Sequence, residues 1–516
     1  MLSRLSEVKL VRSRTRITLF ASLSAMLALG GCASTKPDPL TASELATVSA
    51  ADRQRAQQDV EPLSNALTLQ EAIARAIKYN LGRRTRLMEE ALAQGQLDVG
   101  NYEMLPKLVA SAGYRDRNKD LITRSTDSVT GQPSLAHPYI SSDRTATTTN
   151  LAFTWSLLDF GQSYYASKQN ADRVLIAAEH RRKALHNLIQ DVETAFWRAA
   201  SAQKLRGEVK TTIAAAEDAL RDSRKSESEG LRSPLDALRY QRQVLENLRL
   251  LESIEQELSS ARIELASLIN APLGRDITVV EPAATVGDAW QNVSVDKMEE
   301  MVIANNAELR ESFYNARIAR METRRALLKL FPGLSFNYSV NGSDDSYLIH
   351  QHWTEAGAQL SFNLLGVLSA PAQMRLADAG VAVADQRRMM TQMIVLTQMH
   401  LARLQYHNAL KQFERADSIW KVDRDIATQV ANRESAKTQS KLDLVANETA
   451  AILSELRRYQ ALSQFQAAAS RLQATLGLEP AIGDDRNTPL PQLTQTIDTA
   501  LRQWNAGQPQ PAATAQ

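Results

Sequence analysis

Two stretches of the chain carry apolar residues in alternating steps of three and four, the spacing of a coiled-coil helix. The first begins at Leu185 and continues through Leu188, Val192, Ala195, Ala199, Ala202, Val209, Ile213, Ala216 and Leu220, interrupted only at Arg206. The pattern returns after a break, from Val244 to Ile269. We therefore predict a helix of about 68 residues, about 100 Å long, that folds back into a shorter one. A second such hairpin is predicted over residues 372–436 and 442–476.

Four short segments instead alternate apolar and polar residues with the period of a β-strand. Their apolar positions are Leu108, Ala110, Ala112 and Tyr114; Leu151, Phe153, Trp155 and Leu157; Leu334, Phe336, Tyr338 and Val340; and Ala356, Ala358, Leu360 and Phe362. The apolar stripes of the predicted helices are already used in helix–helix packing. The apolar faces of the strands therefore have no obvious helix layer to pack against, as they would in a soluble protein. Apolar-out, polar-in strands are typical of a transmembrane β-barrel. A soluble sheet covered by helices stays the alternative.

Four strands cannot close a barrel, because the smallest barrel that fills its interior has about eight. An open edge in lipid would leave backbone N–H and C=O groups without partners. We therefore expect several chains to share the barrel, with eight strands from two copies or twelve from three. Residues 116–149 and 342–354, which join the paired strands, are expected to be surface loops.

The sequence also repeats itself. At shifts of 226, 205 and 207 positions, four pairs of segments match: 67–80 with 293–306, 105–108 with 331–334, 157–161 with 362–366, and 233–236 with 440–443. These matches predict two structural repeats, residues 67–270 and 293–477, joined by a connector over residues 271–292.

The N-terminus has the pattern of a bacterial targeting segment. Five basic residues precede an uncharged run from Ile17 to Gly31, which is too short to span a membrane comfortably. The run ends at Leu29-Gly30-Gly31-Cys32, which resembles a lipobox, and Cys32 is the single cysteine of the chain. We predict a signal peptide over residues 1–31, a lipid on Cys32 and a tether over residues 32–66. Residues 478–516 are expected to form a frayed tail.

Composition narrows the class of function. One cysteine excludes a disulfide framework, and 60 Lys and Arg against 58 Asp and Glu include no basic block suited to nucleic acid. Removal of the signal would leave a slightly acidic mature chain. No phosphate-binding loop, hydrolase motif or zinc motif occurs, and His350 with His352 is interpreted as a loop pair. We predict that the chain is not an enzyme and needs no cofactor or metal.

Taken together, these motifs resemble the TolC family of outer-membrane efflux proteins, in its lipidated branch. The features that carry the resemblance are the opening from Leu67 to Asn80, the Leu105-Pro106 entry to the first strand, the junction at Gly161 and the break Gly230-Leu231-Arg232-Ser233. The resemblance implies an α+β membrane protein: a homotrimer whose 12-stranded outer-membrane barrel, with four strands per chain, continues into a long α-helical tunnel across the periplasm. It also implies a periplasmic adaptor, an inner-membrane pump and small-molecule export.

The same resemblance assigns roles at the two breaks between helices. Adaptor docking is expected at the tips, at Gly230, Leu231, Arg232, Ser233, Lys437, Gln439 and Ser440. Asp443 falls where the family has an acidic pore constriction, and Asp236 where an acid links neighbouring helices. Lys437 or Lys441 could replace the partner that the family has at Gln439. Both aspartates also fit a capping box, Ser-x-x-Asp at a helix start, which is the simpler interpretation.

Two other functions remain open from the sequence. The same architecture serves type I protein secretion, and only the lipobox favours drug efflux over it. A structural coiled-coil lipoprotein that spaces the layers of the envelope is the third hypothesis, although a spacer has no need of four strands.

Overall fold

The computed structural model describes residues 37–63, 66–133, 138–229, 233–281, 289–478 and 487–507. The chain divides into two compact units, residues 1–59 and 60–516. The predicted signal, Cys32 and the residues Gly230, Leu231 and Arg232 lie outside the described ranges.

The first unit contains one described helix, α2 (Ala42–Gln57), within the expected tether. Its N-terminus is a capping box: the Thr41 hydroxyl accepts from the Glu44 backbone N–H, and the Glu44 carboxylate accepts from the Thr41 N–H. None of its residues is buried. The predicted tether thus contains a helix, whose start is set by this capping box and not by an apolar period.

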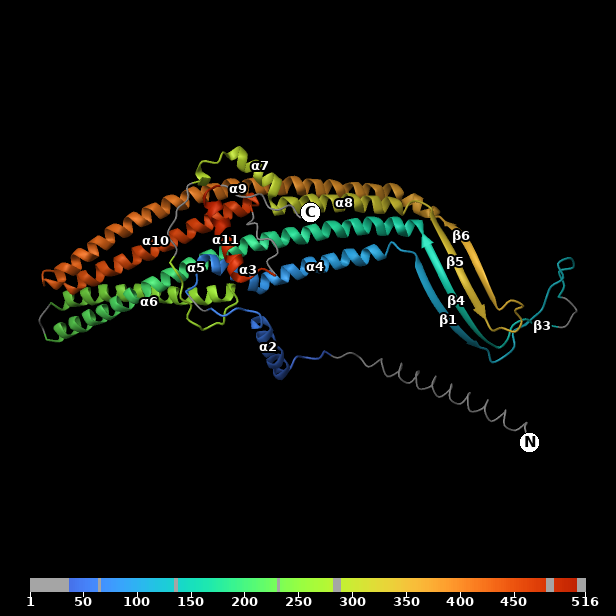
Figure 1. The fold of residues 1–516 in the computed structure, drawn as a ribbon, viewed down its shortest axis with the longest axis horizontal. Coiled ribbons are helices and arrows are strands. Elements are labelled where there is room, and N and C mark those ends of the chain that lie inside the picture. Colours follow the sequence, from blue (N-terminus) through green and yellow to red (C-terminus); the bar gives the residue numbers. More distant parts are fainter. Residues whose placement is uncertain are drawn as a thin grey trace, which may run out of the picture. The chain divides into compact units, whose positions relative to one another are not determined.

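In the second unit, four antiparallel strands form one sheet in the order β1-β4-β5-β6 (Figure 1). They are β1 (Lys107–Asp116), β4 (Thr145–Ser156), β5 (Gly333–Ser343) and β6 (His352–Ser361). The connection from β1 to β4 carries a small ribbon, β2 (Ile122–Thr123) and β3 (Tyr139–Ile140). All four predicted strands are confirmed.

The helices of the second unit repeat in the same order on either side of the connector. The first set is α3 (Leu69–Tyr79), α4 (Leu81–Tyr102), α5 (Leu157–Ser228) and α6 (Pro234–Leu268). After the short η1 (Ala289–Gln291), the second set is α7 (Val295–Asn305), α8 (Ala307–Leu328), α9 (Leu364–Ser435) and α10 (Lys441–Leu476). Both long helices have 72 residues, which corresponds to about 110 Å.

One asparagine occupies the same place in both repeats. Asn80 accepts the Arg83 N–H at the start of α4, and its side-chain amide donates to the Leu268 carbonyl at the end of α6. Asn306 caps α8 and donates to the Thr475 carbonyl near the end of α10. Each asparagine thus bonds the N-terminus of one helix and the C-terminus of another. It fixes where the end of α6 meets α4 in the first repeat and where the end of α10 meets α8 in the second.

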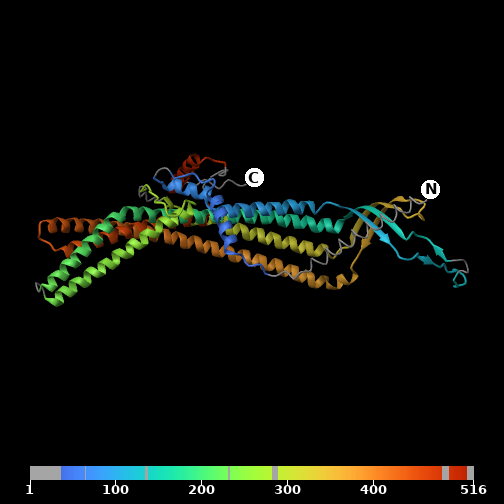
Figure 2. The same ribbon diagram turned by 90° about the horizontal axis from the view of Figure 1, so that it is seen from below.

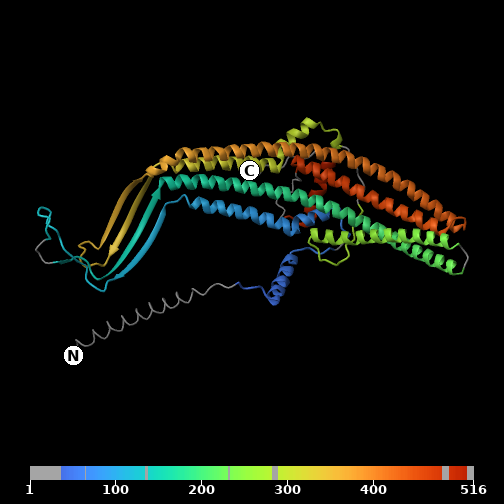
Figure 3. The ribbon, with the colours of Figure 1, turned by 180° about the vertical axis from the view of Figure 1, so that it is seen from behind.

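The four helices next to the sheet are neighbours in the order α4, α5, α8, α9 (Figure 2). This order matches that of the strands that follow or precede them, so the sheet continues as a single layer of helices. Beyond that layer α5 packs on α6 and α10, and α10 packs on α9. The turn from α9 to α10, the end of α5 and the start of α6 lie at the end of these helices away from the strands (Figure 3).

The predicted seam of α5 is buried along its length, with one change of position. Leu205 is fully buried and Arg206 is exposed. The seam position between Ala202 and Val209 is therefore Leu205 and not Arg206, because steps of three and then four residues lead from Ala202 through Leu205 to Val209. The seam is continuous.

The expectation of a frayed C-terminal tail is wrong for residues 490–505, which form α11 (Leu490–Asn505). Its buried side chains, Leu490, Leu493, Ile497, Ala500 and Trp504, recur at helical spacing and pack beside α3. The Trp504 carbonyl accepts a hydrogen bond from the indole of Trp290 at 3.0 Å. Proline and glutamine around this period hid it in the sequence.

Candidate functional site

The register of the sheet places the predicted apolar positions together on one face. Leu108 pairs with Phe153, Phe153 with Tyr338, and Trp155 with Phe336. Leu334 pairs with Leu360 on the same face. This face is solvent-exposed in the single chain, with Leu108 66% and Leu360 70% exposed. Among the described residues no layer of helices covers it, so the soluble-sheet alternative loses the packing it would need.

The opposite face of the sheet is polar. Asn150 pairs with Ser111 on one side and with Asn341 on the other, where the Asn150 amide donates to the Asn341 side-chain carbonyl at 2.6 Å. Thr154 pairs with Asn337. The two outer strands, β1 and β6, each have a neighbour on one side only within the described sheet. The chain therefore presents an apolar face, a polar face and two unpaired edges.

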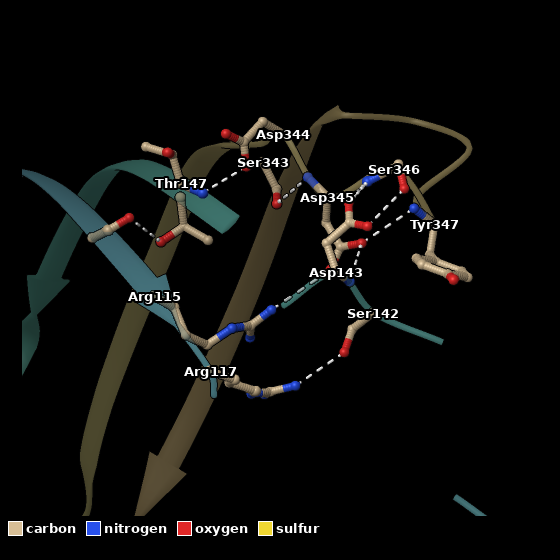
Figure 4. Close-up of polar contacts among 12 residues, drawn as sticks. Arg115, Arg117, Ser142, Asp143, Thr147, Ser343, Asp344, Asp345, Ser346 and Tyr347 are labelled. Carbon is tan, nitrogen blue, oxygen red and sulfur yellow. Dashed lines mark hydrogen bonds and ion pairs between the residues drawn. The ribbon is translucent and has the colours of Figure 1, made fainter. Parts of the chain in front are cut away.

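The two connections between strands lie at the end of the sheet away from the helices (Figure 1), and polar contacts tie them together (Figure 4). Asp143, from the first connection, accepts from the Ser346 backbone N–H and from the Ser346 hydroxyl at 2.9 Å. The Asp143 N–H donates to Asp345 at 3.2 Å, and Arg115 of β1 lies 3.6 Å from the same carboxylate. The turn predicted at Asp344 and Asp345 thus also fastens one predicted surface loop to the other.

The tip between α9 and α10 is closed by a left-handed residue. Lys437 has φ +57°, its N–H donates to the Glu434 carbonyl at 2.8 Å, and the Thr438 N–H donates to the Arg433 carbonyl at 2.9 Å. These two bonds make a Schellman motif, which usually has glycine at the left-handed position. The sequence has Gly230 at the matching place of the other tip, outside the described residues.

Asp443 begins α10 in a dense set of hydrogen bonds. Its backbone N–H donates to the Ser440 hydroxyl at 3.1 Å, and its carboxylate accepts from that hydroxyl at 2.7 Å and from the Gln439 amide at 3.0 Å. The pKa of Asp443 is lowered, first by the bond from the Ser440 hydroxyl; burial opposes this, and the Gln439 amide lowers the pKa further. Asp443 is therefore ionised throughout the physiological range. The N-cap itself is Ser440, and the Asp443 carboxylate holds the Ser440 hydroxyl in place.

Asp236 does not have the capping role that the sequence suggested. Ser233 precedes α6 but makes no side-chain capping bond, and Asp236 lies 3.9 Å from Arg239, with both side chains well exposed. In the described part of the chain no ion pair joins Asp236 to Lys437 or Lys441. Pro234 in the first turn already removes one unsatisfied N–H, which reduces the need for a cap.

Lys441 instead connects the start of α10 with α5, 2.9 Å from Asp222. The hydrogen bond between them raises the pKa of Lys441 and lowers the pKa of Asp222. Farther along the same helices, Arg424 of α9 makes two bonds to Glu208 of α5, at 2.9 and 3.1 Å. Charged pairs at the surface thus join α5 of the first repeat to α9 and α10 of the second, in the part of these helices far from the sheet.

Other classes of site are not supported by the described residues. No group of three or more His, Cys, Asp and Glu within the described ranges could hold a metal ion. No helix among those described is long and apolar enough to cross a membrane.

Comparison with known proteins gives a family match for part of the chain. Residues 85–271, from α4 to the end of α6, match the family model for outer membrane efflux proteins. Over these residues the chain is similar to the members of that family. The proteins of this family are channels, which confirms the prediction that this chain is not an enzyme.

Solved structures of outer membrane channels have the same fold. The chain is similar to the Campylobacter jejuni CmeC outer membrane channel, at 11% identity, with 84% of this chain and 90% of that chain covered and a TM-score of 0.62. The open-state Neisseria gonorrhoeae MtrE outer membrane channel is 16% identical, with 79% of this chain and 88% of that chain covered and a TM-score of 0.59. A membrane protein from Pseudomonas aeruginosa is 15% identical, with 82% of this chain and 92% of that chain covered and a TM-score of 0.59. A search of curated proteins finds no match.

A polar contact between α5 and α8 was not predicted, although the residues that form it have a regular spacing in the sequence. Between α5 and α8, four polar residues of α5 recur at helical spacing, Gln162, Gln169, Asp172 and Glu179. Arg317 binds Asp172, with one bond of 2.9 Å, and Arg310 binds Glu179 at 2.6 Å. The matching arginines at seven-residue spacing on α8 are the signal that was overlooked.

Proposed function

We propose that three copies of this chain form the outer-membrane exit duct of a tripartite efflux pump. In this assembly each copy contributes four strands to a twelve-stranded barrel, which continues into a long helical tunnel across the periplasm. One observation carries the proposal: the layers β1-β4-β5-β6 and α4-α5-α8-α9 have the same order, and both end in open edges. Closure by further copies pairs every strand edge, as lipid requires.

The outer flank of α9 supports closure by further copies. Large apolar side chains remain exposed on it over many turns, including Leu376, Val383, Met390, Met393, Leu401 and Leu404. A continuous exposed apolar surface of this kind favours a protein interface. In the proposed trimer this flank packs on the neighbouring copy.

The hairpin tips are the proposed docking site for a periplasmic adaptor, which connects the duct to an inner-membrane pump. The residues are Gly230, Leu231, Arg232, Ser233, Lys437, Gln439 and Ser440. The proposed cargo is small molecules such as drugs and toxic compounds. Conduction needs no cofactor, and the one proposed modification is a lipid on Cys32, which anchors the mature chain in the outer membrane.

Asp443 is the proposed pore constriction. Three ionised carboxylates around one axis would attract cations and repel anions. Its hydrogen bonds to Ser440 and Gln439 orient the carboxylate at the start of α10. Asp236, which is exposed and lies on the other tip, is the second proposed acidic position.

Type I protein secretion and a structural spacer lipoprotein remain as alternatives to efflux, and a deletion strain distinguishes the three functions. Deletion of the gene should sensitise the cells to drugs and toxic compounds, and the full chain should restore resistance. Loss of a secreted protein with unchanged drug sensitivity would favour type I secretion. A spacer lipoprotein would change neither, and would not form trimers that conduct ions.

A further inference from the structure

A cavity of about 390 Å³ lies between α5, α10, α11 and the start of α3. Its size is within the range of small-molecule sites. The lining that matters for its chemistry is Glu193, Trp197, Ser470, Asp498, Arg502 and Trp504. One wall of the cavity is formed by α11, which was not predicted from the sequence, and the proposed duct gives this cavity no role.

Two buried polar groups line this cavity. Glu193 is 5% exposed and accepts a hydrogen bond from the Ser470 hydroxyl. Burial raises the pKa of Glu193 to about 7, although the Ser470 bond opposes this. Trp197 is 3% exposed, and its indole N–H has no hydrogen-bond partner among the described residues. Both groups lower the stability of the protein, so a ligand that satisfies them would be bound favourably.

The charges around the cavity select the class of ligand. The charged side chains lining it are Glu193 from α5 and Asp498 and Arg502 from α11, with none from α3 or α10. Asp498 is already bonded to Arg502 at 2.7 Å and to Gln70 at 3.1 Å. Glu193 is therefore the carboxyl group of the lining that has no cationic partner there. Two indole rings, which attract cations through their faces, line the same space.

We propose that this cavity binds an organic ammonium ion that also carries a hydrogen-bond acceptor. The positive charge is stabilised by the Glu193 carboxylate and by the indole rings of Trp197 and Trp504. The acceptor takes the free N–H of Trp197. Binding requires Glu193 to lose its proton, so affinity for the ligand increases with pH until that carboxyl group is ionised.

Choline is a suitable probe, because it combines a quaternary ammonium with a hydroxyl group. Its neutral isostere 3,3-dimethyl-1-butanol has the same shape without the charge. Calorimetric titration of the purified full-length protein in detergent should show saturable choline binding and at least tenfold weaker binding of the isostere. Below pH 7 choline affinity should fall about tenfold per pH unit, since one proton is displaced.

Two variants separate this site from general effects. Glu193→Gln keeps an acceptor for Ser470 and should lose at least tenfold in choline affinity together with the pH dependence. Trp197→Phe keeps a ring but removes the N–H, and should weaken choline binding severalfold without changing its pH dependence. Glu448→Gln is the matched control, since Glu448 is a half-buried carboxyl group of raised pKa that lines another cavity; its choline affinity should be unchanged.

The proposal is overturned if choline shows no saturable binding at millimolar concentration, which would mean that the cavity holds only water. It is also overturned if choline and the isostere bind equally, or if Glu193→Gln binds choline as the wild type does. Because the assay measures binding and not transport, failure here leaves the proposed duct untouched.

Discussion

The helix α5 meets the second repeat through two different kinds of contact. Near the sheet it meets α8 through the buried carboxylates of Asp172 and Glu179, which pair with Arg317 and Arg310. Farther from the sheet its buried contacts with α10 are apolar, with Leu205, Ile452 and Leu456 in one cluster, and its charged pairs there lie at the surface. The buried contacts of this helix are therefore directional bonds near the sheet and non-directional packing farther from it.

This difference teaches where the repeats can move. A buried ion pair keeps its energy only in one geometry, because any shift leaves a charge unpaired in a poorly hydrated place. Apolar contacts depend on area removed from water and tolerate small changes of register. We infer that the helices are fixed near the sheet, and that rearrangement, where it occurs, takes place towards the tips.

Breaking the polar contact should have the largest effect. Glu179→Ala leaves Arg182, which is largely buried, without its carboxylate, and also removes the partner of Arg310. We expect a loss of about 3–5 kcal/mol in the free energy of unfolding, measured by denaturant titration. Glu89→Ala breaks the half-exposed pair with Arg86 and should cost about 0.5 kcal/mol or less. Equal effects of the two substitutions would contradict the contrast.

The buried carboxyl group of Glu193 predicts a pH effect of opposite sign to that of a salt bridge. Its pKa is raised from 4.5 to about 7, so the folded state holds the proton longer than the unfolded state does. This contribution to stability is therefore lost as pH rises from about 4.5 to about 7, by on the order of 3 kcal/mol. Denaturant midpoints of Glu193→Gln relative to the wild type should increase over that window. A constant difference would show that Glu193 titrates normally.

The tip between α9 and α10 should become more stable on substitution by glycine. Lys437 holds a left-handed backbone conformation that costs a residue with a Cβ about 1–2 kcal/mol. Lys437→Gly should therefore raise stability by about 0.5–1 kcal/mol after the entropy of glycine is included. Gly477 is the counterpart: it has φ +71°, and a Cβ there would lie 2.3 Å from the Asn305 carbonyl oxygen, so Gly477→Ala should destabilise. A destabilised Lys437→Gly would show that its side chain has a role at the tip.

Asp443 should have the smallest effect on stability and a clear effect on conduction. Asp443→Ala removes a carboxylate that is fixed by Ser440 and Gln439, and should raise the closed-state conductance in planar bilayers. Asp236→Ala, at the second proposed acidic position, should raise the conductance less, because its carboxylate has only a long contact with Arg239 and is not fixed in place. Unchanged conductance in Asp443→Ala would leave that residue with a capping role alone.

The sequence predicted the features that come from periodicity. The four strands and the two helical hairpins are confirmed because apolar spacing dictates them directly. The partners of polar residues could not be predicted in this way. Lys441 pairs with Asp222 and not with Asp236, and this depends on how α10 lies against α5 in three dimensions. The cavity at Glu193 could likewise not be predicted, because part of its lining comes from α11, a helix that the sequence pattern did not reveal.

The central claim is that copies of this chain close a shared barrel and conduct. It is tested most directly by recording single channels from the purified full-length protein in planar bilayers, after its oligomeric state has been measured in the same detergent. We predict trimers that insert and give discrete conductance steps. A folded protein that remains monomeric in solution without detergent, or that inserts as trimers and passes no current, would contradict the account.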